Sequence, residues 1–276
     1  MAVSHRKSLN SGQLAVLDLV CKFRFVSIEL LRTSLGLKNN SGLAQKLKIL
    51  LDQEYIAKHY EPSYRLQGRP AAYYILPKGM RALRAQPDHE WLTDGIIKAS
   101  YKDKSVQLPL IEHTLTVYGL SFELKKLFKD QRVFMKRVLA GFEMFKPARP
   151  DMYTVLNFNP EYEPLRCWVD YIEDNTPRYL LDRKIRDYVT HFEEGNWDVS
   201  GHELPTMLFI CDSAKYEKRL QRMAAKKLES LGSYEPLYYT TNRELLQNAT
   251  RKKQAIWTNA EDTDEVYSLS DIYGNE

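Results

Sequence analysis

The fold of this chain is decided by residues 27–56, which read SIELLRTSLGLKNNSGLAQKLKILLDQEYI. Ser27 is a residue type that accepts hydrogen bonds from the first free amides of a helix, and apolar residues at helical spacing follow it. Gly36 can adopt the positive φ that ends a helix at low cost. The stretch therefore predicts a short helix, a turn and a second helix.

The second of these helices has two different faces. Leucines at i, i+4, i+7 and i+8 give it one buried stripe, made of Leu43, Leu47, Leu50 and Leu51. The opposite side and its flanks carry polar and basic residues, namely Lys38, Asn40, Ser41, Gln45, Lys46 and Lys48. Such a helix fits the major groove of DNA, where Gln can pair with base edges and Lys with phosphates.

A pair of strands is expected directly after these helices. Residues 55–56 start one strand and residues 72–76 form its return partner, with Arg65, Gly68 and Arg69 at the tip between them. Helices followed by such a hairpin are the pattern of a winged helix-turn-helix domain. We therefore expect Arg65 and Arg69 to contact double-stranded DNA together with the polar face of the second helix.

The positive charge is concentrated in this part of the chain. Residues 1–86 contain fourteen Lys and Arg residues and five Asp and Glu residues, an excess of nine, whereas the whole chain carries a net charge of +4. Residues 261–276 contain six acidic residues and no basic residue. Because basic surfaces attract nucleic-acid phosphates, this asymmetry favours DNA contact over an ordinary solvated helix pair.

The composition is that of a globular protein, with 276 residues, 43% of them hydrophobic and 28% charged. No apolar run approaches the roughly 18 to 20 residues that span a bilayer, and no signal-peptide core follows the N-terminus. We expect a cytoplasmic protein with no membrane partner. The three cysteines, Cys21, Cys167 and Cys211, lie far apart in apolar segments, which favours reduced core residues over a zinc site.

The pattern predicts two domains and two connecting or terminal segments. Residues 1–86 form the winged-helix domain, and residues 87–108 are a linker or a helix that docks the domains together. Residues 109–260 form the second domain, and residues 261–276 an acidic, flexible tail. In the second domain a helix, three strands, a helix, a strand, a helix and a strand follow one another, which predicts a mixed α/β sheet covered by helices. The strands are expected at residues 134–139, 152–156, 166–173, 205–211 and 237–241, and the helices at 109–128, 177–192 and 216–231.

Acidic residues mark two strand ends of the second domain. Asp151 begins one strand, and Asp170 and Glu173 lie at the end of the next. Two carboxylates on adjacent strand ends can share Mg²⁺, and a lysine can stabilise charge on a phosphate. Asp151 and Glu173 are thus candidate metal ligands, Lys184 on the following helix completes a candidate catalytic group, and Asp170 is the alternative acid.

This arrangement follows the logic of the PD-(D/E)XK nuclease core, with one departure. Neither Asp170 nor Glu173 is followed two residues later by lysine. We therefore expect a nuclease-like scaffold that binds DNA in preference to one that cleaves it with Mg²⁺. The structural alternative is that these acids are ordinary turn residues before a helix.

Several motifs in a fixed order resemble the replication-relaxation family of plasmids and other mobile elements, which includes MobC-like mobilisation accessory proteins. They are Gly68-Arg-Pro-Ala-Ala-Tyr-Tyr-Ile-Leu-Pro-Lys-Gly79, Glu112-His-Thr-Leu, Arg149-Pro-Asp151, Glu173-Asp-Asn-Thr176 with Lys184 and Tyr188, Pro205-Thr-Met-Leu-Phe-Ile, Tyr239-Thr-Thr241 and Ile256-Trp257. The resemblance covers roughly residues 11–260. It implies a DNA-binding accessory protein with a winged helix joined to a restriction-endonuclease-like domain. Tyr171 departs from the pattern, since an acid often occupies that place.

Three functions remain open at this stage. The first is an accessory protein of plasmid replication or mobilisation that recognises origin DNA, with a relaxase or a replication initiator as partner and a homodimer as one possible form. The second is a metal-dependent endonuclease that uses Asp151, Glu173 and Lys184. The third is a transcriptional repressor whose second domain senses a ligand or dimerises.

Overall fold

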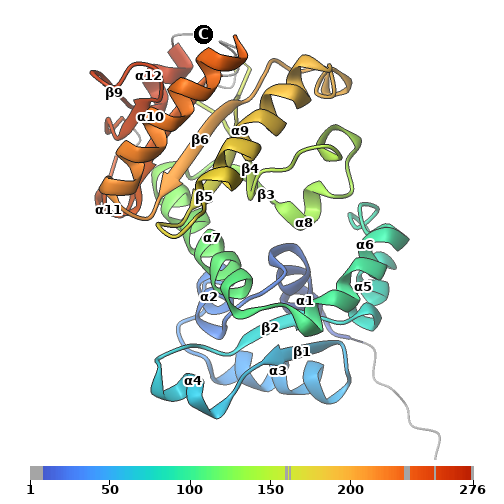
Figure 1. Cartoon of the computed structure of the whole chain (residues 1–276). Helices are drawn as coiled ribbons and strands as arrows, with labels where there is room; N and C mark the ends of the chain where they lie inside the picture. The colour runs from blue at the N-terminus through green and yellow to red at the C-terminus, as the bar shows by residue number, and fades with distance from the viewer. Residues whose placement is uncertain (1–8, 159–160, 162, 233–236, 252, 275–276) are drawn as a thin grey trace, which may run out of the picture. The chain divides into compact units, whose positions relative to one another are not determined.

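The computed structural model describes residues 9–158, 161, 163–232, 237–251 and 253–274 (Figure 1). The chain is a mixed α/β protein. It divides into two compact units, Met1–Tyr118 and Gly119–Glu276. The boundary between them falls within one helix, α7 (Leu108–Leu127).

The first unit begins with three helices, α1 (Ser11–Phe23), α2 (Ile28–Ser34) and α3 (Ser41–Asp52). Ser27 caps α2 as the sequence predicts, because its Oγ accepts a 3.2 Å hydrogen bond from the amide of Leu30. Gly36 follows α2 with a φ of +62°. On α3, the buried leucines are Leu43, Leu47 and Leu50, while Leu51 is half-buried.

An antiparallel hairpin follows α3. Strand β1 (Ile56–His59) pairs with β2 (Ala72–Ile75), with Ile56 opposite Ile75 and His59 opposite Ala72. A short helix that the sequence does not predict, α4 (Pro62–Leu66), lies between the strands. Pro62 is well suited to its first turn, because the helix needs no amide donor there.

The hairpin is tied to the helices on both sides. Before α2, Val26 forms an isolated antiparallel bridge with Tyr73 of β2. After β2, helix α5 (Pro77–Arg84) places Gly79 so close to β1 that a Cβ on Gly79 would lie 2.4 Å from the carbonyl oxygen of Tyr55. Glycine is therefore required at this helix position by packing.

Residues 87–108, which the sequence suggests as a linker or a docking helix, belong to the first unit and are helical over part of their length. They contain α6 (Asp94–Ala99) and the 3-10 helix η1 (Ser100–Ser105). Ile96 and Ile97 are buried, and Asp103 accepts a 3.0 Å hydrogen bond from Nε of Arg24. Pro87 interrupts the helical pattern, but the apolar residues after it still belong to the core.

The second unit is built on a seven-stranded sheet whose spatial order is the order of the chain. Its strands are β3 (Arg132–Met135), β4 (Met152–Leu156), β5 (Leu165–Ile172), β6 (Thr206–Cys211), β7 (Tyr238–Asn242), β8 (Trp257–Asn259) and β9 (Val266–Tyr267). Strands β5, β6 and β7 are parallel to one another, and every other neighbouring pair is antiparallel.

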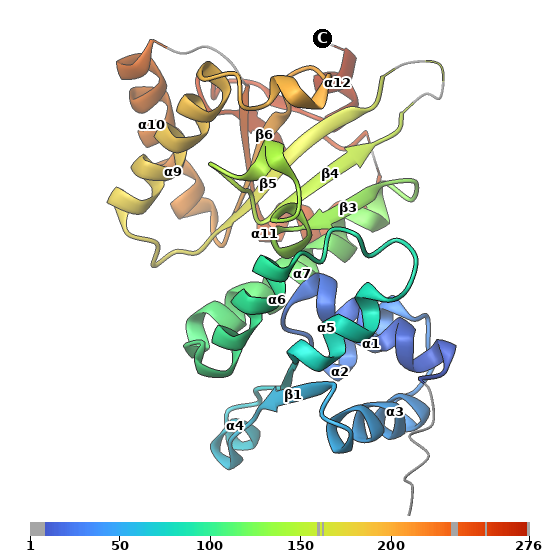
Figure 2. The same ribbon diagram turned by 90° about the vertical axis from the view of Figure 1, so that its right-hand side faces the viewer.

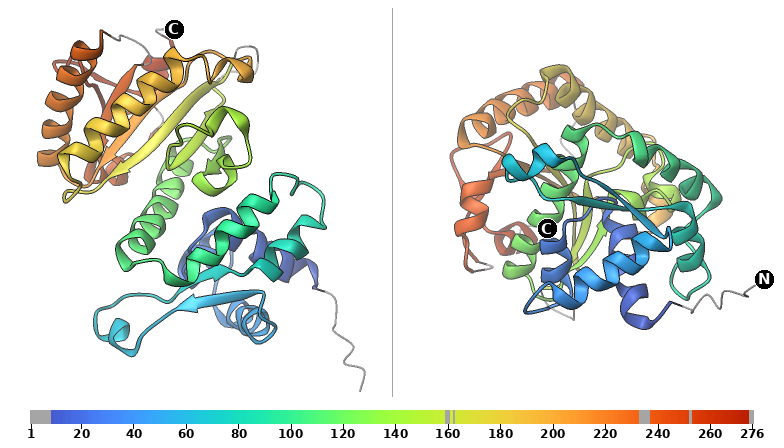
Figure 3. Two further views of the ribbon diagram at one scale, coloured as in Figure 1. Left: turned by 45° about the vertical axis from the view of Figure 1, so that its right-hand side comes forward. Right: turned by 90° about the horizontal axis from the view of Figure 1, so that it is seen from below.

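Two long helices cover one face of this sheet. Helix α9 (Arg178–Glu193) connects β5 to β6, and α10 (Ala214–Leu231) connects β6 to β7. They lie side by side (Figures 1 and 3), as two right-handed crossovers in one direction require. The core between helices and sheet includes Trp168, Ile172, Met207, Phe209, Ile185, Tyr188, Leu220 and Ala224.

The structure differs from the sequence interpretation at two further places in this unit. Residues 134–139 were expected to be one strand, but β3 ends at Met135 and α8 (Lys136–Leu139) begins there. In a segment of only six residues, the spacing of the apolar side chains does not distinguish a strand from a helix. The acidic segment expected as a flexible tail contains β9 and α12 (Leu269–Gly274), in which Leu269 and Ile272 are buried.

The remaining short elements of the second unit are η2 (Glu143–Phe145), η3 (Asp198–Ser200) and α11 (Arg243–Asn248). Figure 2 shows α11 beside the sheet in a view turned by 90°. Among the residues that the structure describes, no helix combines the length and the apolar character needed to cross a membrane.

Candidate functional site

The polar face of α3 is exposed as the sequence predicts. Ser41, Gln45 and Lys48 are all exposed and lie at i, i+4 and i+7, opposite the buried leucine stripe. Lys38, in the turn before the helix, is exposed as well. One turn beyond Lys48, the exposed Asp52 adds an acidic group, so the positive character belongs to the N-terminal turns of α3.

Asn40 and Lys46 are placed differently from the rest of the predicted face. Asn40 is the residue before the first turn of α3, and its Oδ1 is buried without a hydrogen-bond partner. Lys46 is half-buried, and a Cβ on Gly12 of α1 would lie 3.0 Å from its Cε. Asn40 therefore faces inward, and Lys46 leans towards the start of α1.

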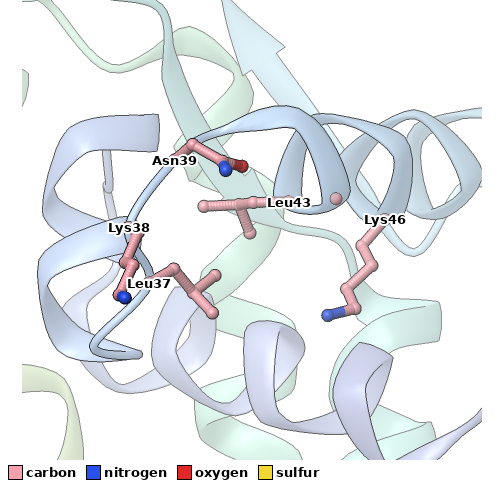
Figure 4. A pocket seen from close by; sticks show the side chains of 6 residues that line it. Leu37, Lys38, Asn39, Leu43 and Lys46 are labelled. Atoms are coloured by element: carbon pink, nitrogen blue, oxygen red, sulfur yellow. The ribbon is translucent and has the colours of Figure 1, made fainter.

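A hollow of about 200 Å³ lies at the start of α3 and is shown in Figure 4. Its lining residues are Leu37, Lys38, Asn39, Gly42, Leu43 and Lys46. The side chains of Lys38 and Lys46 stand on either side of Leu37. Two ammonium groups beside the free amides of a helix N-terminus form a setting that favours an anion.

The hairpin tip carries the other two predicted DNA contacts. Arg65 lies on α4 and is exposed. Arg69 is half-buried, and its Nε lies 3.0 Å from Oε1 of Glu112 on α7. The charge of Arg69 is thus partly neutralised within the protein, whereas that of Arg65 faces solvent.

In the second unit, three charged residues form a row across neighbouring strands. Asp151 precedes β4 and lies opposite Asp170 of β5, since the register pairs Met152 with Val169. On the other side, the amide of Lys136 donates a 3.0 Å hydrogen bond to the carbonyl oxygen of Asp151. Nζ of Lys136 lies 3.2 Å from Oδ1 of the same aspartate. The row therefore lies where three adjacent strands, β3, β4 and β5, begin or end.

Helix α9 completes this group from above the sheet. Nζ of Lys184 donates to Oδ1 of Asp170, and the hydroxyl of Tyr188 donates to Oδ2 at 2.6 Å. The two residues are one helical turn apart and so share a face of α9. The side chains of Asp151 and Asp170 are 8% and 1% exposed, so the acids lie below the surface.

The electrostatics of the group favour its ion pairs. Burial alone would lower the pKa of Lys184, but the carboxylates of Asp170 and Asp151 outweigh it and raise that pKa above its usual value. Burial, with the same two carboxylates, raises the pKa of the Tyr188 hydroxyl well above its usual value. Lys184 is therefore a charged donor and Tyr188 a neutral donor to Asp170 at neutral pH.

The strand geometry favours Asp170, the alternative acid, over Glu173. Glu173 lies three residues beyond Asp170, about 10 Å along an extended chain. It also lies beyond the last residue of β5, Ile172, whereas Asp170 lies within the strand. The structure thus groups Asp151 and Lys184 with Asp170.

The carboxylate oxygens of the group are not arranged to ligate a resident Mg²⁺. Oδ1 and Oδ2 of Asp151 face Lys136 and the amide of Tyr171, and both oxygens of Asp170 accept from protein donors. The described residues contain no set of three or more His, Cys, Asp or Glu side chains arranged to hold a metal. The group is best described as a satisfied, buried network of charges.

No protein-family model, curated protein or solved structure matches this chain.

Two members of the group are absent from the candidate sites that the sequence suggests. Tyr188 could have been found from its spacing of four residues from Lys184, which puts both on one helix face. Lys136 could not, because its contact depends on the register between β3 and β4. A sequence pattern does not fix the register between two strands when the end of one of them is predicted at the wrong residue.

Proposed function

We propose that this chain binds double-stranded DNA and recognises it with α3. The observation that carries the proposal is the exposed row of Ser41, Gln45 and Lys48 on the side of α3 opposite its buried leucines. Twelve residues give a helix about 18 Å long, which fits the major groove. Gln45 is suited to base edges, and Lys38 and Lys48 to the flanking phosphates.

The hairpin after α3 supports the interpretation of the first unit as a winged helix. The antiparallel strands β1 and β2 are joined by a segment that presents Arg65 to solvent. In this arrangement the hairpin contacts the DNA backbone beside the groove that α3 enters, and the contact is electrostatic. The hollow between Lys38 and Lys46 offers a place for one phosphate at the N-terminus of α3.

The process that this DNA binding serves is proposed from the order of motifs in the chain. We infer an accessory protein of plasmid or mobile-element DNA processing, acting in mobilisation or in replication initiation at an origin. The acids Asp151 and Asp170 at paired strand positions beside Lys184 support a nuclease-like second domain. A relaxase or a replication initiator is the proposed protein partner.

A second candidate function is metal-dependent cleavage of DNA. The convergence of Asp151, Asp170 and Lys184 favours it. The occupation of both carboxylates by protein donors opposes it, and so we place it second. Incubation of supercoiled plasmid with the full chain and Mg²⁺ or Mn²⁺ tests it. Nicking that Asp151→Ala abolishes would establish cleavage and would overturn our ranking.

The DNA-binding proposal is tested by fluorescence anisotropy with the full chain at fixed salt. One duplex carries origin DNA of the replicon that encodes the chain, and the other carries the same bases shuffled. We expect tighter binding to the origin, and loss of that preference in Gln45→Ala. Lys48→Gln should weaken both duplexes equally, whereas Lys98→Gln, an exposed lysine of α6, should weaken neither. Equal binding of both duplexes by the wild-type chain would refute sequence recognition.

A further inference from the structure

Helix α10 carries a second basic surface that lies in the other unit of the chain. Its exposed basic residues are Lys215, Lys218, Arg219, Arg222 and Lys226. Lys215, Arg219, Arg222 and Lys226 lie at i, i+4, i+7 and i+11, which places them along one side of the helix. The opposite side, with Leu220 and Ala224, is buried against the sheet.

Few acids of α10 offset these charges. Glu217 is 6% exposed, and its Oε2 accepts a 2.7 Å hydrogen bond from Asn242. Glu229 lies in the last turns, beyond the basic row. Of the basic residues on α10, Lys227 forms an ion pair with a described acid, Asp182 of α9, at 3.1 Å. The basic row, which consists of Lys215, Arg219, Arg222 and Lys226, therefore faces solvent.

Helix stability does not account for this charge pattern. Lys215 and Lys218 lie in the first turns of α10, where the helix dipole favours acids over cations. Like charges four residues apart, such as Arg222 and Lys226, repel each other on a helix surface. The positive charges of the row therefore destabilise α10, and a bound polyanion would neutralise them and relieve their repulsion.

The neighbouring helix extends the same surface. Arg183 and Arg186 of α9 are exposed on the side away from the sheet, and Nε of Arg186 lies 3.9 Å from Oδ1 of its neighbour Asp187. The ion pair between Lys227 and Asp182 bridges α9 and α10, and the two helices lie side by side (Figure 1). The basic surface thus spans two helices that are fixed to one sheet.

The shape of this surface favours a nucleic-acid backbone over a membrane. A helix that binds a membrane inserts its apolar side between lipids. The apolar side of α10 is already occupied, since Leu220, Ala224 and Leu228 are at most 1% exposed in the core of the second unit. The surface can offer charge to a partner, but no free apolar face.

We propose that the outer face of α10 binds the phosphate backbone of duplex DNA, at a site separate from α3. From Lys215 to Lys226 the helix spans about 16 Å. A duplex segment of that length carries about ten phosphates, so the row can face several of them at once. Such binding does not depend on base sequence. This contact adds to the recognition proposed for α3, and it is made by the other unit of the chain.

The test is a variant of the full chain with Lys215→Gln, Arg222→Gln and Lys226→Gln, which leaves Arg219 stacked over the ring of Tyr216. The control variant is Lys125→Gln, Lys129→Gln and Lys253→Gln, which removes the same charge from exposed positions outside α10. Fluorescence anisotropy measures the Kd for a 30-base-pair duplex of shuffled sequence from 50 to 200 mM salt. Circular dichroism confirms that both variants are folded.

The α10 variant is expected to raise Kd about tenfold or more at 100 mM salt, relative to the control variant. It should also reduce the slope of log K against log salt by about 2.7, because three phosphate contacts are lost. The same slope and Kd in the two variants would overturn the proposal. So would wild-type binding to phosphatidylserine vesicles that the α10 variant loses while it keeps its affinity for DNA.

A parallel variant with Gln45→Ala and Lys48→Gln separates this proposal from that for α3. If the α10 variant behaves as expected and the α3 variant keeps both its affinity and its preference for the origin, recognition by α3 fails and the α10 site stands. If the α3 variant loses the preference for the origin while the α10 variant matches its control, the α10 site fails and recognition by α3 stands.

Discussion

The main-chain amide of Asp151 donates a 3.1 Å hydrogen bond to Oδ1 of Asp170. Asp151 in turn holds the neighbouring strand, since its Oδ2 accepts a 3.2 Å hydrogen bond from the amide of Tyr171, the residue after Asp170. Each carboxylate thus fixes the backbone beside the other. Their first role is to hold β4 and β5 in register at the end where α9 crosses the sheet.

This role predicts a large loss of stability when Asp170 is neutralised. Asp170→Asn leaves the ammonium group of Lys184 without its partner in a mostly buried place, and should lower the free energy of unfolding by about 3 kcal/mol. Urea denaturation measures the change. Lys184→Met should also be costly, but the double variant should cost about 1 to 3 kcal/mol less than the sum of the two. Strict additivity of the two changes would show that they do not interact.

The raised pKa values of Lys184 and Tyr188 predict a loss of stability at alkaline pH. Both groups hold their protons more tightly when folded than when unfolded, where their usual values are 10.5 and 10.0. Their contribution is therefore complete below about pH 9 and falls as pH rises through the raised values of the folded chain. The stability difference between the wild-type chain and Lys184→Met, measured in urea from pH 8 to 11.5, should shrink at the alkaline end. A constant difference would contradict the assigned direction.

Gly79 is predicted to be the least replaceable glycine of the first unit. A Cβ there would meet the carbonyl oxygen of Tyr55 at 2.4 Å and Cγ1 of Ile75 at 2.8 Å. Gly79→Ala should therefore force α5 away from the hairpin and cost about 1 to 3 kcal/mol of unfolding free energy. Gly42→Ala is the matched control, because a Cβ on Gly42 of α3 meets nothing within 4 Å. It should be neutral or stabilise by up to about 1 kcal/mol.

The ion pair between Arg69 and Glu112 predicts a gain of DNA affinity when the acid is removed. Glu112→Gln should free the guanidinium for a phosphate, lower Kd for duplex DNA and steepen its salt dependence by about 0.9. The pair is substantially exposed, so the free energy of unfolding should change by less than about 1 kcal/mol. Glu123→Gln, which releases Lys126 of the second unit, controls for the loss of one acid. An unchanged salt slope in Glu112→Gln would count against contact by Arg69.

Local signals explain why much of the mixed α/β fold could be predicted from the sequence. Ser27 caps α2 and Gly36 has a positive φ, as their residue types suggest. Residues 152–156, which include the aromatic Tyr153 and the β-branched Thr154 and Val155, form β4 over the same range. These features depend on neighbours within a few residues, which a sequence pattern records.

The remaining features depend on partners that are distant in the chain. Asp103 is buried because Arg24 pairs with it, and nothing in residues 87–108 indicates that partner. In the acidic C-terminal segment, Leu269 and Ile272 are buried although charge dominates the composition. The group around Asp170 is predicted only in part for the same reason. Lys184 is found from its place on the predicted helix, whereas the contact of Lys136 depends on the register between two strands.

The seven-stranded sheet has a consequence for how the chain folds. Each strand from β4 to β9 pairs with the strand that immediately precedes it in the sequence, so no strand waits for a later one to be inserted between two others. Short sequence separation between partners lowers the entropy lost on pairing and speeds folding. The sheet can therefore grow from β3 in one direction while synthesis continues, and the hydrogen bonds that join Asp151 to Asp170 and Tyr171 can form before β6 has left the ribosome.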